Sequence, residues 1–285
     1  MGVEGLGRMG KRHWKTLIYR APQAKLTALT AVCTPAPAEL EWARKFFGPE
    51  SGVEMLEQPG LQAVWVSTST DLHAQVTTAA IHKNLDVLCE KPLSDRLQAR
   101  AVKPHLKIMA GYSRRFDASY RSAKAQIDAS TIGRSFIRLH QSVRAGKNGA
   151  VFVDRTIHGI DLSHWWYLGE RGRGAQARLR RRHHRATTRA WQRPTLNDID
   201  NGIAVVENWD GKMACFYASR TQKHGHDVAN EANEFLWSVA EDKPVPVGLD
   251  LGLKGMEIGW ALQKALVTFD RQGRRVEEGG QTTGV

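Results

Sequence analysis

Short apolar runs alternate with amphipathic stretches through residues 1–111. The runs predict buried strands over 3–5, 26–33, 61–66, 85–89 and 107–111, and the stretches between them predict helices over 8–20, 39–47 and 71–83. Asp71 is expected to cap the third helix and Asn84 to end it. This alternation predicts an α/β domain with a parallel, doubly wound sheet over residues 1–111.

The pattern changes after Gly111. Strands are expected over 136–143, 203–209 and 212–219, and helices over 116–127, from Asp154 to 168, over 229–241 and over 251–267. Asp210-Gly211 is expected to join the last two strands as a hairpin turn. Residues 112–285 are therefore predicted to form a second, α+β domain with an antiparallel-rich sheet.

One segment makes the whole chain basic. Of 41 basic residues against 29 acidic ones, nine arginines lie between Arg171 and Arg193 with no acid among them, and the rest of the chain is almost neutral. We interpret 171–195 as an irregular, solvated segment. A nucleic-acid or membrane-surface patch is a second interpretation, which no binding fold or interleaved aromatic pattern supports. A third is that the segment is not natural coding sequence, since it resembles translation in a wrong frame.

The composition is that of a globular protein of two domains. The chain has 285 residues, 41% of them hydrophobic and 25% charged, and no apolar run reaches the roughly 18 residues that cross a bilayer. Cys33, Cys89 and Cys215 lie far apart in apolar stretches. That placement favours buried thiols in a reducing compartment over a disulfide framework or a metal site.

A glycine-rich turn separates the first strand from the first helix. Its sequence, Gly5-Leu6-Gly7-Arg8-Met9-Gly10, has the G-x-G-x-x-G spacing that lets backbone amides approach a pyrophosphate at a helix N-terminus. Its place inside a βαβ unit favours a dinucleotide site over a plain tight turn. Because the turn begins at Gly5, we expect no secretory leader and a cytoplasmic protein.

The second strand leads into Thr34, at a place where dinucleotide enzymes often carry an acid that binds the ribose 2′-hydroxyl. Without a carboxylate at Thr34, nothing there repels a 2′-phosphate, and Arg8 could reach one. The expected cofactor is therefore NAD or NADP, with a lean toward NADP.

The tripeptide Glu90-Lys91-Pro92 follows the fourth strand. In a desolvated cleft beside a nicotinamide, Lys91 could relay a proton, and Pro92 would define the bend that presents it. The plainer interpretation is a surface lysine. Together with the glycine turn, the tripeptide favours a nicotinamide-dependent oxidoreductase, or the remains of one.

Asp154 and His158 lie four residues apart and would share one face of a helix. His158 could act as general base toward a substrate hydroxyl, and Asp154 could orient the substrate or the imidazole. The plainer interpretation is an ordinary helix with a buried histidine.

Several motifs occur in a recognisable order. They are Gly5 to Gly10, Ser-Thr-Ser-Thr-Asp-Leu-His at 67–73, Glu90-Lys91-Pro92, Gly-Tyr-Ser-Arg-Arg-Phe-Asp at 111–117, and Asp154-x-x-x-His158-x-x-Asp161. Together they resemble the glucose–fructose oxidoreductase, inositol dehydrogenase and MocA family, most of all its inositol 2-dehydrogenase branch. The resemblance covers roughly residues 1–168 and 198–285.

The resemblance implies a Rossmann domain and a substrate-binding domain whose open sheet often builds a homo-oligomer. It also implies hydride transfer between NAD(P) and a CH–OH ring carbon of a sugar or cyclitol, with Lys91, Asp154 and His158 as the catalytic residues and no metal. Tyr112 and Arg115 would lie near the substrate with Asp154 and His158. The implied cofactor contacts are Gly5, Leu6, Gly7, Arg8, Met9, Gly10, Thr34, Ser67, Thr68, His73, Glu90, Lys91 and Pro92.

The chain departs from the family pattern in three places. The crossover between Leu93 and Pro104 is shorter by about a helix, and the arginine-rich segment replaces sheet strands. Between Ser219 and Asn230 the chain passes from hairpin to helix where relatives have more strands. We therefore expect a depleted sheet in the second domain.

Three kinds of function are compatible with this sequence. An active polyol or sugar dehydrogenase uses Lys91, Asp154 and His158. A catalytically silent relative would bind the dinucleotide as a sensor or regulator, or the chain is a truncated, non-functional product. Nucleic-acid binding through 171–193 is the least favoured function, and would show affinity that falls steeply with salt.

Overall fold

The chain folds into two compact units. The first comprises Met1–Asp117 with Asp227–Leu253, and the second comprises Ala118–His226 with Lys254–Val285. The computed structural model describes residues 1–19, 31–47, 55–93, 103, 105–129, 131, 137–142, 157–168, 186–192, 199–207, 213–219, 229–264, 266–269 and 275–276.

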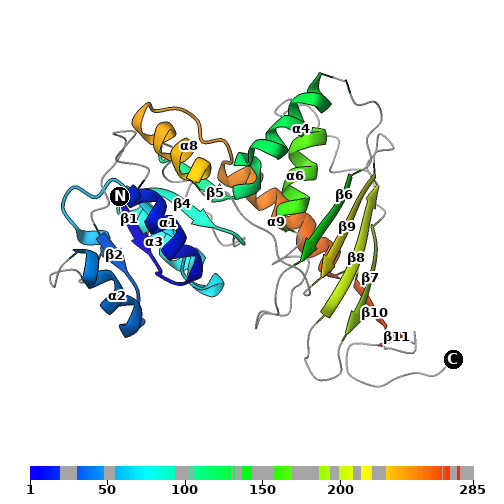
Figure 1. Cartoon of the computed structure of the whole chain (residues 1–285), viewed down its shortest axis with the longest axis horizontal. Coiled ribbons are helices and arrows are strands. Elements are labelled where there is room, and N and C mark those ends of the chain that lie inside the picture. Colours follow the sequence, from blue (N-terminus) through cyan, green and yellow to red (C-terminus); the bar gives the residue numbers. More distant parts are fainter. Residues whose placement is uncertain are drawn as a thin grey trace. The chain divides into compact units, whose positions relative to one another are not determined.

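The first unit is built on a five-stranded parallel sheet (Figure 1). Its order is β2-β1-β3-β4-β5, with β1 at Gly2–Glu4, β2 at Ala31–Cys33, β3 at Ala63–Val66, β4 at Asp86–Glu90 and β5 at Ile108–Gly111. Every residue of β3 and β5 is buried, as expected of parallel strands covered on both faces. The predicted parallel α/β sheet is confirmed. Its order reverses between β1 and β3, whose carboxyl ends therefore mark the place where open α/β sheets bind ligands.

Helices connect these strands close to the predicted positions. They are α1 at Arg8–Tyr19, α2 at Pro37–Phe47 and α3 at His73–His82, with short 3-10 helices η1 at Met55–Glu57, η2 at Thr70–Leu72 and η4 at Ser113–Phe116. The prediction that Asp71 caps α3 is wrong, because Asp71 lies inside η2 and no side chain caps α3. Asn84 adopts the left-handed φ of 60° at the end of α3, as a helix-ending asparagine can.

A late segment of the chain returns to the first unit. Helix α8, Ala229–Ala240, packs on α1 and η4, and Asn230 Nδ2 donates to the Phe116 carbonyl at 3.2 Å. The Ala110 amide donates to the Val247 carbonyl at 2.8 Å. From the sequence, these late residues are predicted to lie in the second domain, because an amphipathic pattern does not specify the unit in which a helix is buried.

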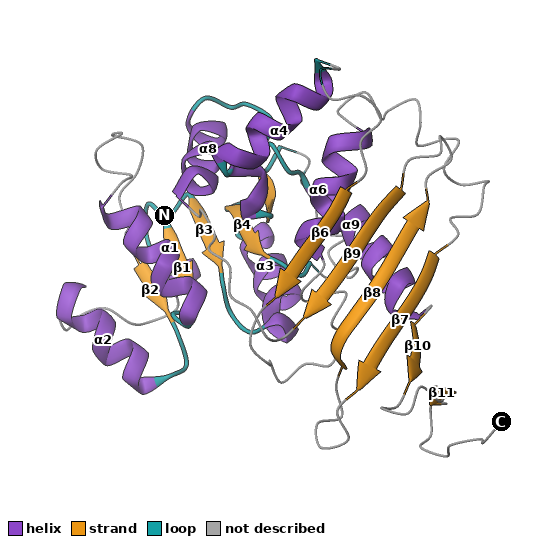
Figure 2. Cartoon of the chain, turned by 45° about the vertical axis from the view of Figure 1, so that its right-hand side comes forward, coloured by secondary structure: helices purple, strands orange, loops and turns teal. Residues whose placement is uncertain are grey.

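The second unit contains a six-stranded mixed sheet (Figure 2). Its order is β11-β10-β7-β8-β9-β6, with β6 at Ile137–Ser142, β7 at Ala186–Gln192, β8 at Ile199–Glu207, β9 at Met213–Ser219, β10 at Leu266–Phe269 and β11 at Arg275–Val276. The pairs β7–β8, β8–β9 and β10–β11 are antiparallel, whereas β10–β7 and β6–β9 are parallel. The predicted pairing of β8 with β9 is confirmed.

Two expectations for this unit are wrong. Strand β7 lies inside 171–195, which was expected to be irregular, and it pairs on both sides with β8 and β10. The threonines and the tryptophan of β7 favour a strand, but the many arginines around them led to the prediction of an irregular, solvated segment. The helix predicted over 251–267 ends early, at Lys264, and its last predicted residues belong to β10, while depletion of the sheet relative to the family stays a prediction.

Three helices carry the remaining described residues of this part of the chain. They are α4 at Ala118–Asp128, α6 at Ile157–Leu168 and α9 at Leu249–Lys264, the last beginning in the first unit and ending in the second. Helix α6 packs on β6 and β9. Among the described helices, none has both the length and the hydropathy of a membrane span.

Candidate functional site

The glycine turn joins β1 to α1 at the switch point of the first sheet. Gly5 has a φ of +88°, and a Cβ there would lie 2.7 Å from the backbone of Ser67 and Thr68. A Cβ on Gly10 would lie 1.8 Å from the Gly5 carbonyl oxygen. A Cβ on Gly7, in contrast, would meet no protein atom within 4 Å. Two glycines thus permit close packing, while the third faces open space beside the first turn of α1, as a pyrophosphate cradle requires.

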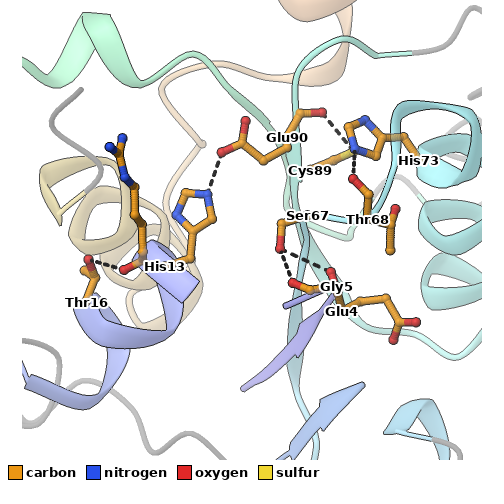
Figure 3. A network of polar contacts seen from close by, with 10 residues as sticks. Glu4, Gly5, His13, Thr16, Ser67, Thr68, His73, Cys89 and Glu90 are labelled. Atoms are coloured by element: carbon orange, nitrogen blue, oxygen red, sulfur yellow. Dashed lines mark hydrogen bonds and ion pairs between the residues drawn. The ribbon is translucent and has the colours of Figure 1, made fainter. Parts of the chain in front are cut away.

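The other residues of the turn have different surroundings. Leu6 is fully buried in the core, whereas Arg8 is exposed at the start of α1 and Met9 is half-buried. Ser67 ties the end of β3 to the turn, since its hydroxyl donates to the carbonyls of Glu4 and Gly5 at 3.2 and 2.8 Å (Figure 3). The ends of β1 and β3 are therefore joined where a dinucleotide would lie.

Thr34, just after β2, is buried and is paired with a carboxylate. Its hydroxyl donates to Glu39 Oε2 at 2.6 Å, and Glu39 lies in the first turn of α2. The sequence analysis found no acid at the end of β2. The fold supplies one from five residues further along the chain.

Glu90 and His13 form a buried pair beside Lys91. His13 Nε2 lies 2.5 Å from Glu90 Oε1, and neither residue is more than 6% exposed (Figure 3). Burial favours a higher pKa for Glu90, but the hydrogen bond and charge of His13, with the charges of Lys91 and His73, bring that pKa below its ordinary value. Glu90 is thus held as an anion, and stabilises the fold at pH values above its unfolded-state pKa. That stabilisation is lost as the pH falls through the lower folded-state pKa.

His73, at the start of α3, joins two turns of the site. Its Nδ1 lies 3.0 Å from the Pro92 carbonyl oxygen and its Nε2 lies 3.2 Å from the Thr68 carbonyl oxygen. The ring is 2% exposed. His73 therefore holds the turn after β3 against the turn after β4, and a contact with the cofactor stays a prediction.

The cysteines of the first unit are free thiols. Burial, with the nearby Glu4 carboxyl, raises the pKa of Cys33 to about 12, and burial raises the pKa of Cys89 to about 12. Both stay protonated at neutral pH and are poor nucleophiles. In the part of the chain that the structure describes, no three His, Cys, Asp or Glu side chains gather as a metal site.

Tyr112 and Arg115, expected near the substrate, are both buried in the first unit. Tyr112 is 0% exposed and its hydroxyl donates to the Gly252 carbonyl at 3.1 Å. Arg115 lies in η4 and is 5% exposed. The hydroxyl of Tyr112 thus joins the end of β5 to the first turns of α9.

We expect Tyr112→Phe to lower the free energy of unfolding by about 1 kcal/mol, because one buried hydrogen bond is lost. Denaturant unfolding measures this change, with KM for substrate as the second readout. An unchanged stability with a raised KM would instead place the Tyr112 hydroxyl on the substrate.

Of the proposed catalytic residues, only two are described. Lys91 directly follows β4 and is half-buried, and the peptide bond between Lys91 and Pro92 is cis. His158 lies in the first turn of α6 in the second unit and is 6% exposed, and Asp161 in the next turn is 1% exposed. Asp154 lies outside the described residues. Its place beside His158 stays a prediction.

Comparisons with known proteins agree with this geometry. Residues 1–116 match the family described as "Oxidoreductase family, NAD-binding Rossmann fold". The chain is 30% identical over 247 residues to the scyllo-inositol 2-dehydrogenase (NAD(+)) of Bacillus subtilis, covering 80% of this chain and 69% of that protein. The chain belongs to this oxidoreductase family, the glucose–fructose oxidoreductase, inositol dehydrogenase and MocA family.

Other family members are similar over comparable lengths. The chain is 27% identical to the myo-inositol 2-dehydrogenase of Thermotoga maritima, and the matched region covers 80% of this chain and 70% of that protein. The structure of apo scyllo-inositol dehydrogenase from Lactobacillus casei superposes with a TM-score of 0.79 at 24% identity, covering 93% of this chain and 95% of that one. The same enzyme with bound NAD(H) and scyllo-inositol gives a TM-score of 0.76. The family resemblance drawn from the motifs is thus confirmed.

Two residues that contact predicted site residues were not predicted from the sequence. His13 lies 77 residues from Glu90, and only the packing of α1 against the sheet brings them together. Glu39 is closer in sequence to Thr34, and an acid in the first turn of the helix after β2 is a signal that could have been read. The acid of dinucleotide-binding proteins is expected at the strand end itself, where this chain has Thr34.

Proposed function

We propose that this protein oxidises a CH–OH ring carbon of a cyclitol such as an inositol, using NAD as the hydride acceptor. The observation that carries the proposal is the similarity over 247 residues to a scyllo-inositol 2-dehydrogenase (NAD(+)). The open space in front of Gly7 and the lysine after β4 give the first unit the features that this reaction needs.

In this proposal, each site residue has its own role in oxidising the substrate or in binding the cofactor. The bound nicotinamide supplies the acceptor for the hydride that leaves the carbinol carbon. His158 accepts the hydroxyl proton as general base, so that the product is a ketone, and Asp154 orients the imidazole or the substrate. Lys91 hydrogen-bonds the substrate oxygen and relays that one hydroxyl proton, which ends on His158. Backbone amides at the start of α1 hold the pyrophosphate.

Two titrations test the proposal. NADH and NADPH are added in parallel while tryptophan fluorescence and heat are recorded, and turnover is then measured on myo-inositol, scyllo-inositol and open-chain polyols. We expect binding of NADH and reduction of NAD by an inositol. Binding without turnover on any polyol would favour a catalytically silent relative, and no binding of either nucleotide would overturn the assignment.

We propose NAD rather than NADP, which revises the lean taken from Thr34 alone. The support is the hydrogen bond that holds the Glu39 carboxylate at the end of β2, where Rossmann proteins place the acid that meets the ribose 2′-hydroxyl. A carboxylate there repels a 2′-phosphate. Arg8 at the start of α1 is the group that would oppose this preference.

We expect Glu39→Gln to shift the ratio of NADPH to NADH affinity toward NADPH by about tenfold, or about 1.4 kcal/mol. Glutamine keeps the size of the side chain and the hydrogen bond with Thr34 but removes the charge. Glu41→Gln is the matched control, since it removes an exposed charge from the same helix. An equal change in both variants would assign the effect to net charge and not to Glu39.

We also propose a cytoplasmic homo-oligomer that associates through the sheet of the second unit. The support is the mixed sheet itself, whose outer described strands are β11 and β6, because sheet edges readily pair with another copy. Light scattering during size-exclusion chromatography measures the state. A monomer at micromolar concentration would contradict the association.

A further inference from the structure

Lys91 stands between two residues that are each held by a buried histidine. His13 contacts the side chain of Glu90 on one side of Lys91 at 2.5 Å, and His73 contacts the carbonyl of Pro92 on the other side at 3.0 Å. We propose that His13 and His73 are positioning residues that together set the place of Lys91. The proposal rests on the proposed function, in which Lys91 acts on the substrate oxygen.

The His13 contact is rigid because the ring is held on its face as well as at its edge. His13 is 0% exposed and stacks on Trp65 of β3, with ring centroids 3.7 Å apart and planes 27° from parallel. Figure 3 shows the ring aimed from α1 at the Glu90 carboxylate. A buried ring that is stacked on one face and hydrogen-bonded at its edge is restricted to one rotamer, so the nitrogen that contacts Glu90 Oε1 has a defined position.

His13 also links Lys91 to the dinucleotide site. It lies in the first two turns of α1, whose N-terminus follows the glycine turn. The contact of His13 with Glu90 therefore sets the place of Glu90 relative to α1, the helix that would receive the cofactor.

His73 makes the matching contact on the other side. Its ring lies between the carbonyl oxygens of Pro92 and Thr68, so that the turn after β4 cannot move without the turn after β3. The Thr68 turn in turn adjoins Gly5 and Ser67, which line the same edge of the sheet. The two neighbours of Lys91 are thus held at the nucleotide-facing edge, Glu90 through its side chain and Pro92 through its backbone carbonyl.

Positioning matters for lysine because its four-carbon chain has many rotamers. A displacement of about 1 Å in a catalytic group can cost about 100-fold in rate. Holding residues 90 and 92 in place restricts the Lys91 backbone, and so restricts the positions that its ammonium group can reach. The two histidines would then affect kcat far more than cofactor binding.

The test compares two substitutions of His13 in the full chain. His13→Leu removes the donor and keeps an apolar side chain, whereas His13→Gln keeps an N–H donor. We measure the Kd of NADH, kcat and KM with scyllo-inositol or myo-inositol, and thermal unfolding. We expect His13→Leu to lower kcat by about 10- to 100-fold with the Kd of NADH within about twofold, and His13→Gln to recover most of the loss.

A second pair of substitutions tests His73, which contacts the carbonyl of Pro92 on the other side of Lys91. His73→Phe is expected to lower kcat and His73→Gln to recover part of it. Thr16→Val is the control, because Thr16 is buried on the same helix as His13 and loses one hydrogen bond, to the Arg12 carbonyl, without contacting the neighbours of Lys91. Its kcat should equal that of the wild type. If His13→Leu does not fold, Glu90→Gln replaces it, since this variant removes the carboxylate charge and keeps the shape.

Several outcomes overturn the proposal. A wild-type kcat in His13→Leu and His73→Phe would do so, as would a loss of kcat matched by an equal loss of NADH affinity. A glutamine variant no better than its apolar counterpart would also contradict it, because a merely packed ring would explain that result. Failure of the wild-type protein to bind NADH or oxidise any inositol refutes the proposed function instead, and is seen before any variant is made.

Discussion

Gly7→Ala should weaken NADH binding by at least about 100-fold, or about 2.7 kcal/mol, while leaving the free energy of unfolding unchanged. A Cβ at this position meets no protein atom within 4 Å, so the apo fold accommodates it. The same methyl group would occupy the space into which the amides of the turn receive a pyrophosphate. Calorimetric titration with NADH and denaturant unfolding of the same preparation measure the two quantities.

Gly10→Ala is expected to have the opposite effect to Gly7→Ala, a loss of stability in place of a specific loss of NADH binding. Its Cβ would lie 1.8 Å from the Gly5 carbonyl oxygen, a backbone atom that cannot rotate away. We expect this variant to lose more than about 3 kcal/mol of stability, or to fail to fold. Wild-type NADH affinity in Gly7→Ala would show that the cofactor does not approach this turn, and the dinucleotide site would have to lie elsewhere.

Lys91→Ala should lower kcat by about 100- to 10,000-fold, the range by which a positioned proton-transfer group contributes. The Kd of NADH should change by less than about threefold, because the residue acts on the substrate oxygen. Lys91→Arg separates charge from proton transfer. Since a guanidinium stays protonated, this variant should be as slow as the alanine variant if Lys91 relays a proton, and faster if only the positive charge matters.

Lys83→Ala is the matched control for Lys91. Lys83 follows α3, is about half-exposed, and pairs on the surface with Glu57. Surface ion pairs contribute little, so kcat and stability should stay close to the wild-type values. Unaltered turnover in Lys91→Ala would remove Lys91 from the mechanism, and the family resemblance would then describe the fold without the chemistry.

Much of the first unit could be predicted because its signals are local. A G-x-G-x-x-G turn needs particular backbone conformations at three neighbouring residues, and the apolar runs of β3, β4 and β5 are short, continuous and bounded by turn residues. The prediction that Asp71 caps α3 was wrong because a local signal can fit two kinds of helix. The periods of a 3-10 helix and an α-helix, about 3.0 and about 3.6 residues per turn, cannot be told apart over three residues, so the sequence alone did not distinguish η2 from the start of α3.

The second unit was less predictable because strand pairing there is not local. Strand β10 follows the last helix yet pairs with β7, and the apolar residues of β10 were read as the continuation of α9. Likewise, α8 has an ordinary amphipathic pattern that fits burial in either unit. Only its packing on α1 and η4 assigns it to the first.

By itself, the sequence determined the family, the parallel sheet of the first unit, and Lys91 at the end of a strand, because each of these depends on residues close together along the chain. The tertiary structure decided which side chains surround them. It brought the Glu39 carboxylate to Thr34, His13 to Glu90 across 77 residues, and His73 to the turn after Lys91. Such contacts depend on strand order and on the direction in which each helix packs against the sheet. Those are properties of the whole fold that no single stretch of residues contains.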